Sequence, residues 1–117
     1  MDIEAFRKYC LELQGVEETF PFGPDNLVYK VFGKVFAITG LDEEEFRVNL
    51  KCDPERAIEL REEYPDQIIP GWHMNKKHWN TVHFENGLSD KLLKELIDQS
   101  YELVFDGLPL SLKKQMK

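Results

Sequence analysis

The residues best suited to chemistry lie together in one short stretch, residues 72–83. This stretch holds all three histidines and both tryptophans of the chain, two adjacent lysines and no acidic residue. Imidazole, indole, amide and ammonium groups bind anions and stack on flat ligands. The sequence therefore predicts that a functional site includes this stretch.

The three histidines, His73, His78 and His83, invite a metal-site hypothesis. A zinc site needs imidazoles that converge within about 2.1 Å of one ion. The histidines are spaced by five residues, which reverses the face of a strand and rotates by about 140° around a helix. Neither regular element brings the three rings together. The acidic run 42–45 is expected to be a solvated turn, so we expect no metal site and no cofactor.

The sequence contains no recognisable motif of nucleophilic catalysis or of phosphate binding. No serine lies in a GxSxG elbow, and the seven glycines are scattered along the chain. Cys52 precedes an expected helix start at Asp53-Pro54, where the pKa of a thiol can be lowered. The same residues also form an ordinary strand-to-helix junction. We expect no catalytic residue set, and an enzyme that uses His73 or His78 as acid–base catalyst stays a third hypothesis.

Helix signals mark three segments that must position this stretch. Residues 2–14 carry apolar residues at helical spacing behind the cap Asp2. Asp53-Pro54 begins a second helix that runs to about residue 63. Ser89-Asp90 caps a last helix, which Gly107-Leu108-Pro109 breaks.

Strand signals mark the residues between the helices. Segments 27–31 and 35–39 predict a hairpin closed by residues 32–34. Residues 46–51 alternate between apolar and polar side chains, which is typical of an antiparallel sheet with one buried face. Residues 81–84 predict a further strand, and residues 68–71 lead into the stretch 72–83. Residues 17–25 are expected to be a connector whose two aromatic residues, Phe20 and Phe22, pin it against the domain.

The order helix, three strands, helix, one or two strands, helix predicts an α+β fold. Short turns between successive strands imply an antiparallel sheet packed against helices. A chain of 117 residues that is 42% hydrophobic is expected to fold as a single domain covering residues 1–117.

Charge and cysteine content limit the classes of partner. The net charge of −7 disfavours binding to nucleic acid or anionic membrane over the whole surface, although a local basic face is compatible with it. The first residues lack a signal-peptide pattern, and no apolar run approaches the ~20 residues of a membrane span. Cys10 and Cys52 are expected to be reduced thiols. We expect a cytoplasmic protein without a membrane partner.

A basic and aromatic face follows from the strand alternation. If Val82 and Phe84 point inward, then Trp79, Thr81 and His83 point outward. They would adjoin the outward residues of the segment 46–51, with Lys30 nearby. Cations, a flat ring and amide donors suit phosphates and unstacked bases. The alternative stays open that the tryptophans are packing anchors and that the lysines only solubilise a loop.

Residues 70–82, PGWHMNKKHWNTV, resemble the signature stretch of the MmcQ/YjbR family of small bacterial proteins. The resemblance covers nearly the whole chain in order, including residues 22–23, 31–37, 49–54, 60–64 and 100–104. It implies a compact α+β fold similar to the bacterial frataxin CyaY, and DNA binding through a double-wing arrangement. The wings would be the 32–34 hairpin and a turn beside Lys76-Lys77. No catalytic residue set is implied.

The leading hypothesis is a DNA-binding module. Lys51, Lys76 and Lys77 would meet phosphate, Trp79 would stack, and His73, His78 and Asn80 would donate hydrogen bonds. The complete set of expected nucleic-acid contacts is Arg47, Asn49, Lys51, His73, Asn75, Lys76, Lys77, His78, Trp79 and Asn80. The alternative is a regulatory protein of unknown function that holds a protein partner or a small anionic ligand in the same place.

Overall fold

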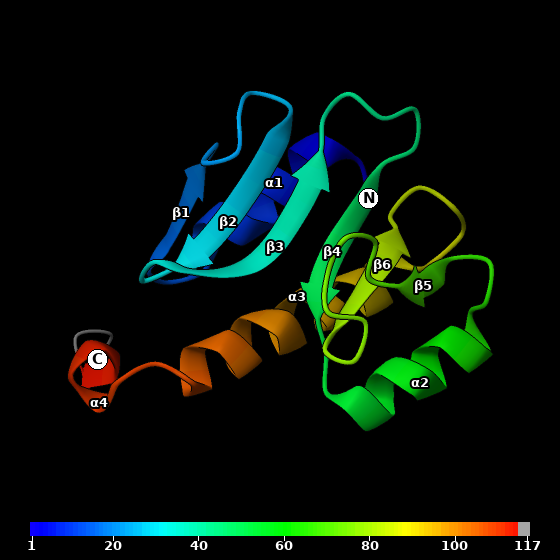
Figure 1. The fold of residues 1–117 in the computed structure, drawn as a ribbon. Coiled ribbons are helices and arrows are strands. Elements are labelled where there is room, and N and C mark those ends of the chain that lie inside the picture. The colour runs from blue at the N-terminus through cyan, green and yellow to red at the C-terminus, as the bar shows by residue number, and fades with distance from the viewer. Residues whose placement is uncertain (115–117) are drawn as a thin grey trace.

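The computed structural model describes residues 1–114 and builds them around an antiparallel sheet of six strands in the order β1-β2-β3-β4-β6-β5. The sheet confirms the expected α+β class (Figure 1). The elements in chain order are α1 (Ile3–Glu12), β1 (Val16–Thr19), β2 (Asn26–Val31), β3 (Lys34–Gly40), β4 (Arg47–Lys51), α2 (Pro54–Glu63), β5 (Ile68–Pro70), β6 (Trp79–His83), α3 (Asp90–Asp106) and α4 (Leu110–Lys113).

The helices begin where the capping residues predict. The side chain of Asp2 accepts a hydrogen bond from the Ala5 N–H at 2.9 Å, and the Ser89 hydroxyl accepts from the Leu92 N–H at 3.1 Å. Asp53 caps α2 in the same way, ahead of a proline in the first turn. Each cap satisfies a backbone donor that the helix itself leaves free. None of the described helices is long and apolar enough to cross a lipid bilayer.

Helices cover one face of the sheet and leave the other open. Figure 1 shows α1 and α3 behind the strands, whereas the loop of residues 71–78 lies in front of β4 and β6. The covered face holds the core, in which Phe6 packs edge-to-face against Tyr29 and Phe84 at centroid distances of 5.4 and 5.3 Å. Burial of such rings is the main stabilising term of a small domain.

The segment expected to be a connector contains an additional edge strand, β1, so that four strands precede α2. Glu18 of β1 accepts two hydrogen bonds from Arg7 at 3.0 and 2.9 Å and one from the Tyr29 hydroxyl at 2.5 Å. These long-range partners stabilise an acidic strand that local pattern does not reveal. The expectation that Phe20 and Phe22 pin this segment against the domain was wrong, because the two residues are 47% and 68% exposed.

The sheet opens between β3 and β4 because β3 carries a bulge. Tyr29 pairs with Ala37 but Lys30 pairs with Val35, which leaves Phe36 as the extra residue. Ser100 of α3 fills the gap: its hydroxyl donates to the Phe36 carbonyl at 2.5 Å and accepts from the Lys51 N–H at 2.8 Å. The helix therefore supplies the hydrogen bonds that the two strands no longer make to each other.

Candidate functional site

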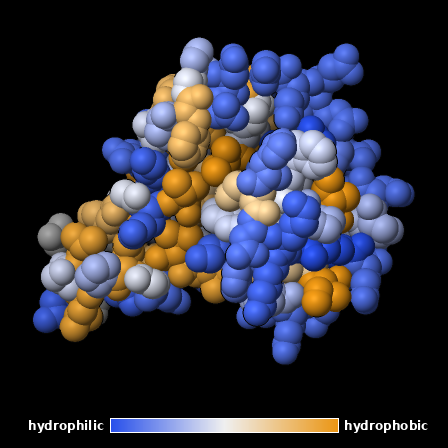
Figure 2. Space-filling model, in the orientation of Figure 1, coloured by the Kyte–Doolittle hydropathy of each residue, from blue (hydrophilic) through white to orange (hydrophobic). Residues whose placement is uncertain are grey.

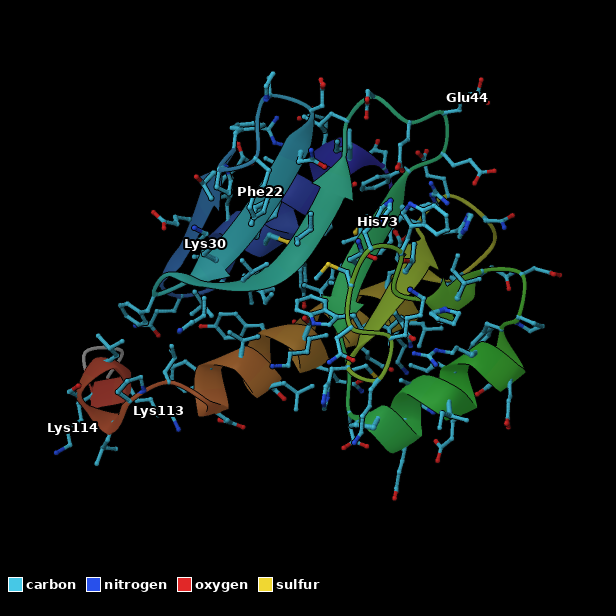
Figure 3. All side chains as sticks on the ribbon, viewed as in Figure 1. Phe22, Lys30, Glu44, His73, Lys113 and Lys114 are labelled. Atoms are coloured by element: carbon cyan, nitrogen blue, oxygen red, sulfur yellow. The ribbon has the colours of Figure 1, made fainter. Side chains whose placement is uncertain are left out.

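The outward-facing residues expected on β4 and β6 lie side by side on the open face. The strands pair antiparallel with Arg47 opposite His83, Asn49 opposite Thr81, and Lys51 opposite Trp79. Val82 and Phe84 are buried on the covered face, at 2% and 1% exposure. Lys30 shares the open face, but it lies on β2 beside Val35, at a distance from His73 in Figure 3.

Two successive turns fold the loop of residues 71–78 over this face. The Met74 N–H donates to the Gly71 carbonyl at 3.2 Å, which closes a turn that holds His73 at a positive φ of 61°. Asn75 begins the second turn, and its Oδ1 accepts from the Lys77 N–H at 3.0 Å. A histidine in the left-handed region costs of order 1–3 kcal/mol, so the surrounding contacts must hold it.

A small polar network fixes the first turn to the sheet. The Thr81 hydroxyl accepts from the Trp72 N–H at 2.8 Å and donates to the Asn49 Oδ1. The Asn49 Nδ2 reaches the Trp72 carbonyl at 3.5 Å. Asn49 and Thr81 therefore position the loop, and much of the hydrogen-bonding capacity of Asn49 is used within the protein.

Arg61 of α2 fixes the second turn from the other side. Its Nε donates to the Asn80 Oδ1 at 2.7 Å, and its Nη2 donates to the carbonyls of Lys76 and of Trp79, the latter at 3.3 Å. Asn80 is 2% exposed and its Nδ2 donates to the Ala57 carbonyl at 3.5 Å. The expectation that Asn80 donates to a ligand is therefore wrong, because its side chain faces the helices and is already paired.

Gly71 lets the loop approach β6 closely. Its N–H donates to the Trp79 carbonyl at 2.9 Å. A Cβ at this position would lie 2.8 Å from the Trp79 Cβ and 3.1 Å from the Met74 Cβ. Only glycine permits this contact without displacing the strand.

An open groove of about 640 Å³ lies on this face of the sheet. Its apolar lining comes from Phe22, Val35, Ile38, Trp72, Met74 and Trp79, and its polar lining includes Asn26, Glu43, Arg47, Asn49, His73 and Thr81. Figure 2 shows hydrophobic surface in the middle of this face that continues to the lower left of the view, with mostly hydrophilic surface above it and to its right. In Figure 3, Phe22 and His73 project in front of the sheet on either side of β3.

The large rings of the groove do not pack on one another. Among the described residues, Phe22 and Trp79 take part in no aromatic pair. The Trp72 ring pairs only with the His73 ring, at a centroid distance of 4.9 Å. Phe22 and Trp72 are 68% and 56% exposed. The space of the groove is therefore not filled by stacking among these rings.

The cations of the expected site differ in their partners. Arg47, which was expected to contact nucleic acid, forms an ion pair with Glu43 at 3.2 Å. Lys51, Lys76 and Lys77 form no ion pair with a carboxylate within residues 1–114. All three lie close to Trp79, Lys51 as its cross-strand partner and the two lysines in the turn before it.

The histidines have separate surroundings. His73 lines the groove, whereas the Nδ1 of His83 lies 3.4 Å from Glu45 at the end of β6. The carbonyl of His78 accepts from the Cys52 N–H at 2.7 Å. In the described part of the chain, no three residues of His, Cys, Asp or Glu are grouped so that they could hold a metal ion.

Cys52 does not have the activated thiol that its place before α2 allowed. The residue is only 6% exposed, and burial raises the pKa of its thiol above the ordinary value. A buried thiol of raised pKa is a poor nucleophile at neutral pH.

Phe22, Glu43 and Arg61 belong to the site but were not expected there. Phe22 reaches the groove from the β1–β2 loop, which local sequence marks only as a proline- and glycine-containing connector. Glu43 belongs to the acidic turn and Arg61 to a surface helix. No local signal distinguishes them from solvated charges, since their roles depend on contacts across the fold.

Comparison with known proteins agrees with this architecture. The family model described as YjbR matches residues 11–103. The uncharacterized protein YbdF of Escherichia coli O157:H7 is 40% identical over 97% of this chain and 93% of its own length. The uncharacterized protein YjbR of Escherichia coli K12 is 32% identical over 97% of this chain and 96% of its own length.

Two solved structures share the fold. The crystal structure of the Deinococcus radiodurans protein DR2400 has a TM-score of 0.90 at 40% identity, covering 97% of this chain and 86% of that one. A crystal structure of a Pseudomonas syringae protein has a TM-score of 0.74 at 27% identity, over 89% of this chain and 99% of that one. By its sequence match and its fold, the chain belongs to the YjbR family.

Proposed function

We propose that the protein is a small binding module that holds a flat, ring-bearing molecule in the groove on the open face of its sheet. The observation that carries this proposal is the set of three separated rings, Phe22, Trp72 and Trp79, along a groove of about 640 Å³. Small-molecule sites have volumes of roughly 300–1,000 Å³ and an apolar lining with a few polar groups. The groove has this size and composition.

The loop geometry supports the same proposal. Arg61, Thr81 and Asn49 hold the loop so that Trp72 and Trp79 line the groove although the surface is exposed. A preformed site binds with a smaller loss of conformational entropy than one that must be ordered by its ligand. Rings held apart in advance therefore favour a role in binding over a role in packing.

The two tryptophans of the chain make the test direct, since both line the groove. Purified protein is titrated with benzoate, phenylalanine, adenosine and guanosine while tryptophan emission is recorded. A seated ring is expected to change the intensity or wavelength of the emission and to saturate. If none of these compounds changes the emission, the proposal is wrong.

A matched pair of variants separates groove binding from adventitious contact. Phe22→Ala removes a groove wall and is expected to weaken binding by about 1–3 kcal/mol, the usual contribution of an aromatic stacking contact. Phe20→Ala changes an exposed phenylalanine of the same loop that does not line the groove, so it should bind as the unmodified protein does. Equal affinities of the two variants would contradict the model.

Binding of single-stranded DNA is the second candidate function. The observation that favours it is a group of three lysines around Trp79, namely Lys51, Lys76 and Lys77, which form no ion pair within residues 1–114. In this function the lysines would meet phosphates and the indole would stack on a base. The hairpin turn at Phe32-Gly33 and the turn at residues 75–78 would form the two wings of a double-wing arrangement.

The DNA-binding candidate is tested with labelled single-stranded and duplex DNA at about 50 and about 200 mM salt. Replacement of Lys76 and Lys77 by alanine should weaken binding and reduce its salt dependence. Replacement of Lys91 and Lys94, exposed lysines of α3 on the covered face, is the control. No binding at the lower salt concentration, or equal loss in both variants, would exclude this function.

A further inference from the structure

One end of the groove carries a charged pair at the top of β3 and β4. Gly40 and Arg47 flank the last paired residues of the two strands, and Glu43 comes from the turn that joins them. The Glu43 Cδ lies 3.2 Å from the position that a Cβ of Gly40 would occupy. The missing side chain of Gly40 therefore lets Glu43 fold back over the sheet and into the groove.

This orientation distinguishes Glu43 from the other acids of the same turn. The side chain of Glu45 is 66% exposed, whereas that of Glu43 is 36% exposed and that of Arg47 is 26% exposed. Figure 3 shows Glu44 directed away from the sheet. Of this acidic turn, Glu43 is the residue that lines the groove together with Arg47.

The pair leaves hydrogen-bonding capacity unused on both partners. The Nε and Nη2 of Arg47 lie 3.4 and 3.2 Å from the same oxygen, Oε2 of Glu43. A guanidinium has five N–H donors and a carboxylate has two acceptor oxygens. Within the described residues, the Glu43 Oε1 and the remaining N–H groups of Arg47 have no protein partner, and both residues line the groove.

The charges at this end restrict what can bind. A ligand that carries only a carboxylate would be attracted by Arg47 but repelled by Glu43. A ligand that carries only an ammonium would be attracted by Glu43 but repelled by Arg47. Each would leave one partner of the half-buried pair without compensation, which costs free energy. A head group that carries both charges close together can pair with both residues at once.

We propose that the ligand of the groove carries a dipolar head group, a carboxylate next to an ammonium, adjacent to its ring. A ring-bearing α-amino acid has this chemistry: the carboxylate would accept from Arg47, the ammonium would donate to Glu43, and the ring would lie between Ile38 and the tryptophans of the groove. This inference rests on the proposed function of the groove and names the class of molecule that it holds.

The experiment compares three compounds of the same ring and chain length. L-phenylalanine has both charges, 3-phenylpropionate has only the carboxylate, and 2-phenylethylamine has only the ammonium. Each is titrated into the full chain while tryptophan emission is recorded. L-phenylalanine is expected to bind at least about tenfold more tightly than either of the others, because each lacks one charge-assisted hydrogen-bonding group.

Two variants assign the charges to their partners. In Glu43→Gln the advantage of L-phenylalanine over 3-phenylpropionate should disappear, and in Arg47→Gln the advantage over 2-phenylethylamine should disappear. The thermal midpoints of both variants should fall by only a few degrees, since a single, partly solvated ion pair contributes about 0–1 kcal/mol to stability. The variants therefore report on recognition and not on folding.

The outcomes separate the two proposals. Binding of all three compounds with equal affinity would overturn the dipolar head group and leave the groove as a binding site. Stronger binding of 3-phenylpropionate or of 2-phenylethylamine would overturn it in favour of a singly charged ligand. No change of emission with these compounds, nor with adenosine, guanosine or benzoate, would overturn both proposals.

Discussion

Replacement of Gly71 by alanine should specifically weaken the loop that shapes the groove. The added Cβ would lie 2.8 Å from the Trp79 Cβ and 2.9 Å from the Trp79 carbonyl oxygen. Ordinary van der Waals contact begins near 3.4 Å, so the loop or β6 must move by about 0.6 Å. Gly71 does not have a positive φ, and the penalty therefore comes from the steric clash and not from the backbone preference of alanine.

The magnitude follows from two contributions. Overpacking of a closely packed site costs about 1–3 kcal/mol. The same shift stretches the hydrogen bond from the Gly71 N–H to the Trp79 carbonyl, 2.9 Å long, which contributes about 1 kcal/mol. We expect Gly71→Ala to lower the free energy of unfolding by about 2–4 kcal/mol and to weaken ligand binding in the groove.

The assay is urea unfolding followed by far-ultraviolet circular dichroism, which does not depend on the tryptophans. Gly107→Ala is the matched control, because Gly107 has a φ of −81° and the nearest atom to its added Cβ lies at 3.5 Å. The free energy of unfolding of that variant should rise by about 0.4–1 kcal/mol, because alanine reduces the conformational entropy of the unfolded chain. Equal or greater stability of Gly71→Ala than of the unmodified protein would refute the close packing of the loop on β6.

Three further changes test separate parts of the structure. Ser100→Ala removes the hydroxyl that bridges β3 and the Lys51 N–H, and urea unfolding should show a loss of about 1–3 kcal/mol; an unchanged midpoint would contradict this role. Glu18→Gln should destabilise the protein at neutral pH. The hydrogen bond from Arg7 lowers the pKa of the Glu18 carboxyl, so this stability is present above the unfolded pKa of about 4.3 and is lost as the pH falls through the lowered folded pKa. The difference between the two proteins should therefore shrink in acid, and a constant difference would be inconsistent with the linkage. His73→Gly relieves the positive φ and should raise the free energy of unfolding by about 1 kcal/mol in the same assay; a loss would show that the ring itself stabilises the turn.

Helix starts and sheet faces were predictable because their signals are local. Asp2, Asp53 and Ser89 cap the helices from within three residues of the donors they satisfy. The alternation of residues 46–51 gave the faces of β4 correctly. The match to the YjbR family confirmed the resemblance that the stretch 70–82 carries.

Asn80 obeys the two-residue alternation of a strand. It lies between Trp79 and Thr81 on β6 and therefore shares the inward face of Val82. The amide was expected at a ligand because of its place in a polar, aromatic stretch. The two-residue period of the strand predicts the inward orientation that the structure has.

The edge strand β1 and the groove depend on contacts between distant residues. Arg7 and Tyr29 stabilise Glu18 of β1 from α1 and β2, and Phe22 faces a loop about fifty residues further along the chain. Such contacts leave no periodic signal in the sequence. The likeness to CyaY and the double-wing arrangement stay predictions.

The most direct test of the central claim is the nuclear magnetic resonance signal of the indole N–H groups. The chain has two tryptophans, and both line the groove, so a spectrum of labelled protein contains two indole signals that report on the site. Titration with L-phenylalanine should shift both indole signals together and to saturation, with smaller changes at residues of α1 and α4. Indole signals that stay fixed with L-phenylalanine, and equally with benzoate, adenosine and guanosine, would contradict the assignment of the groove as a binding site.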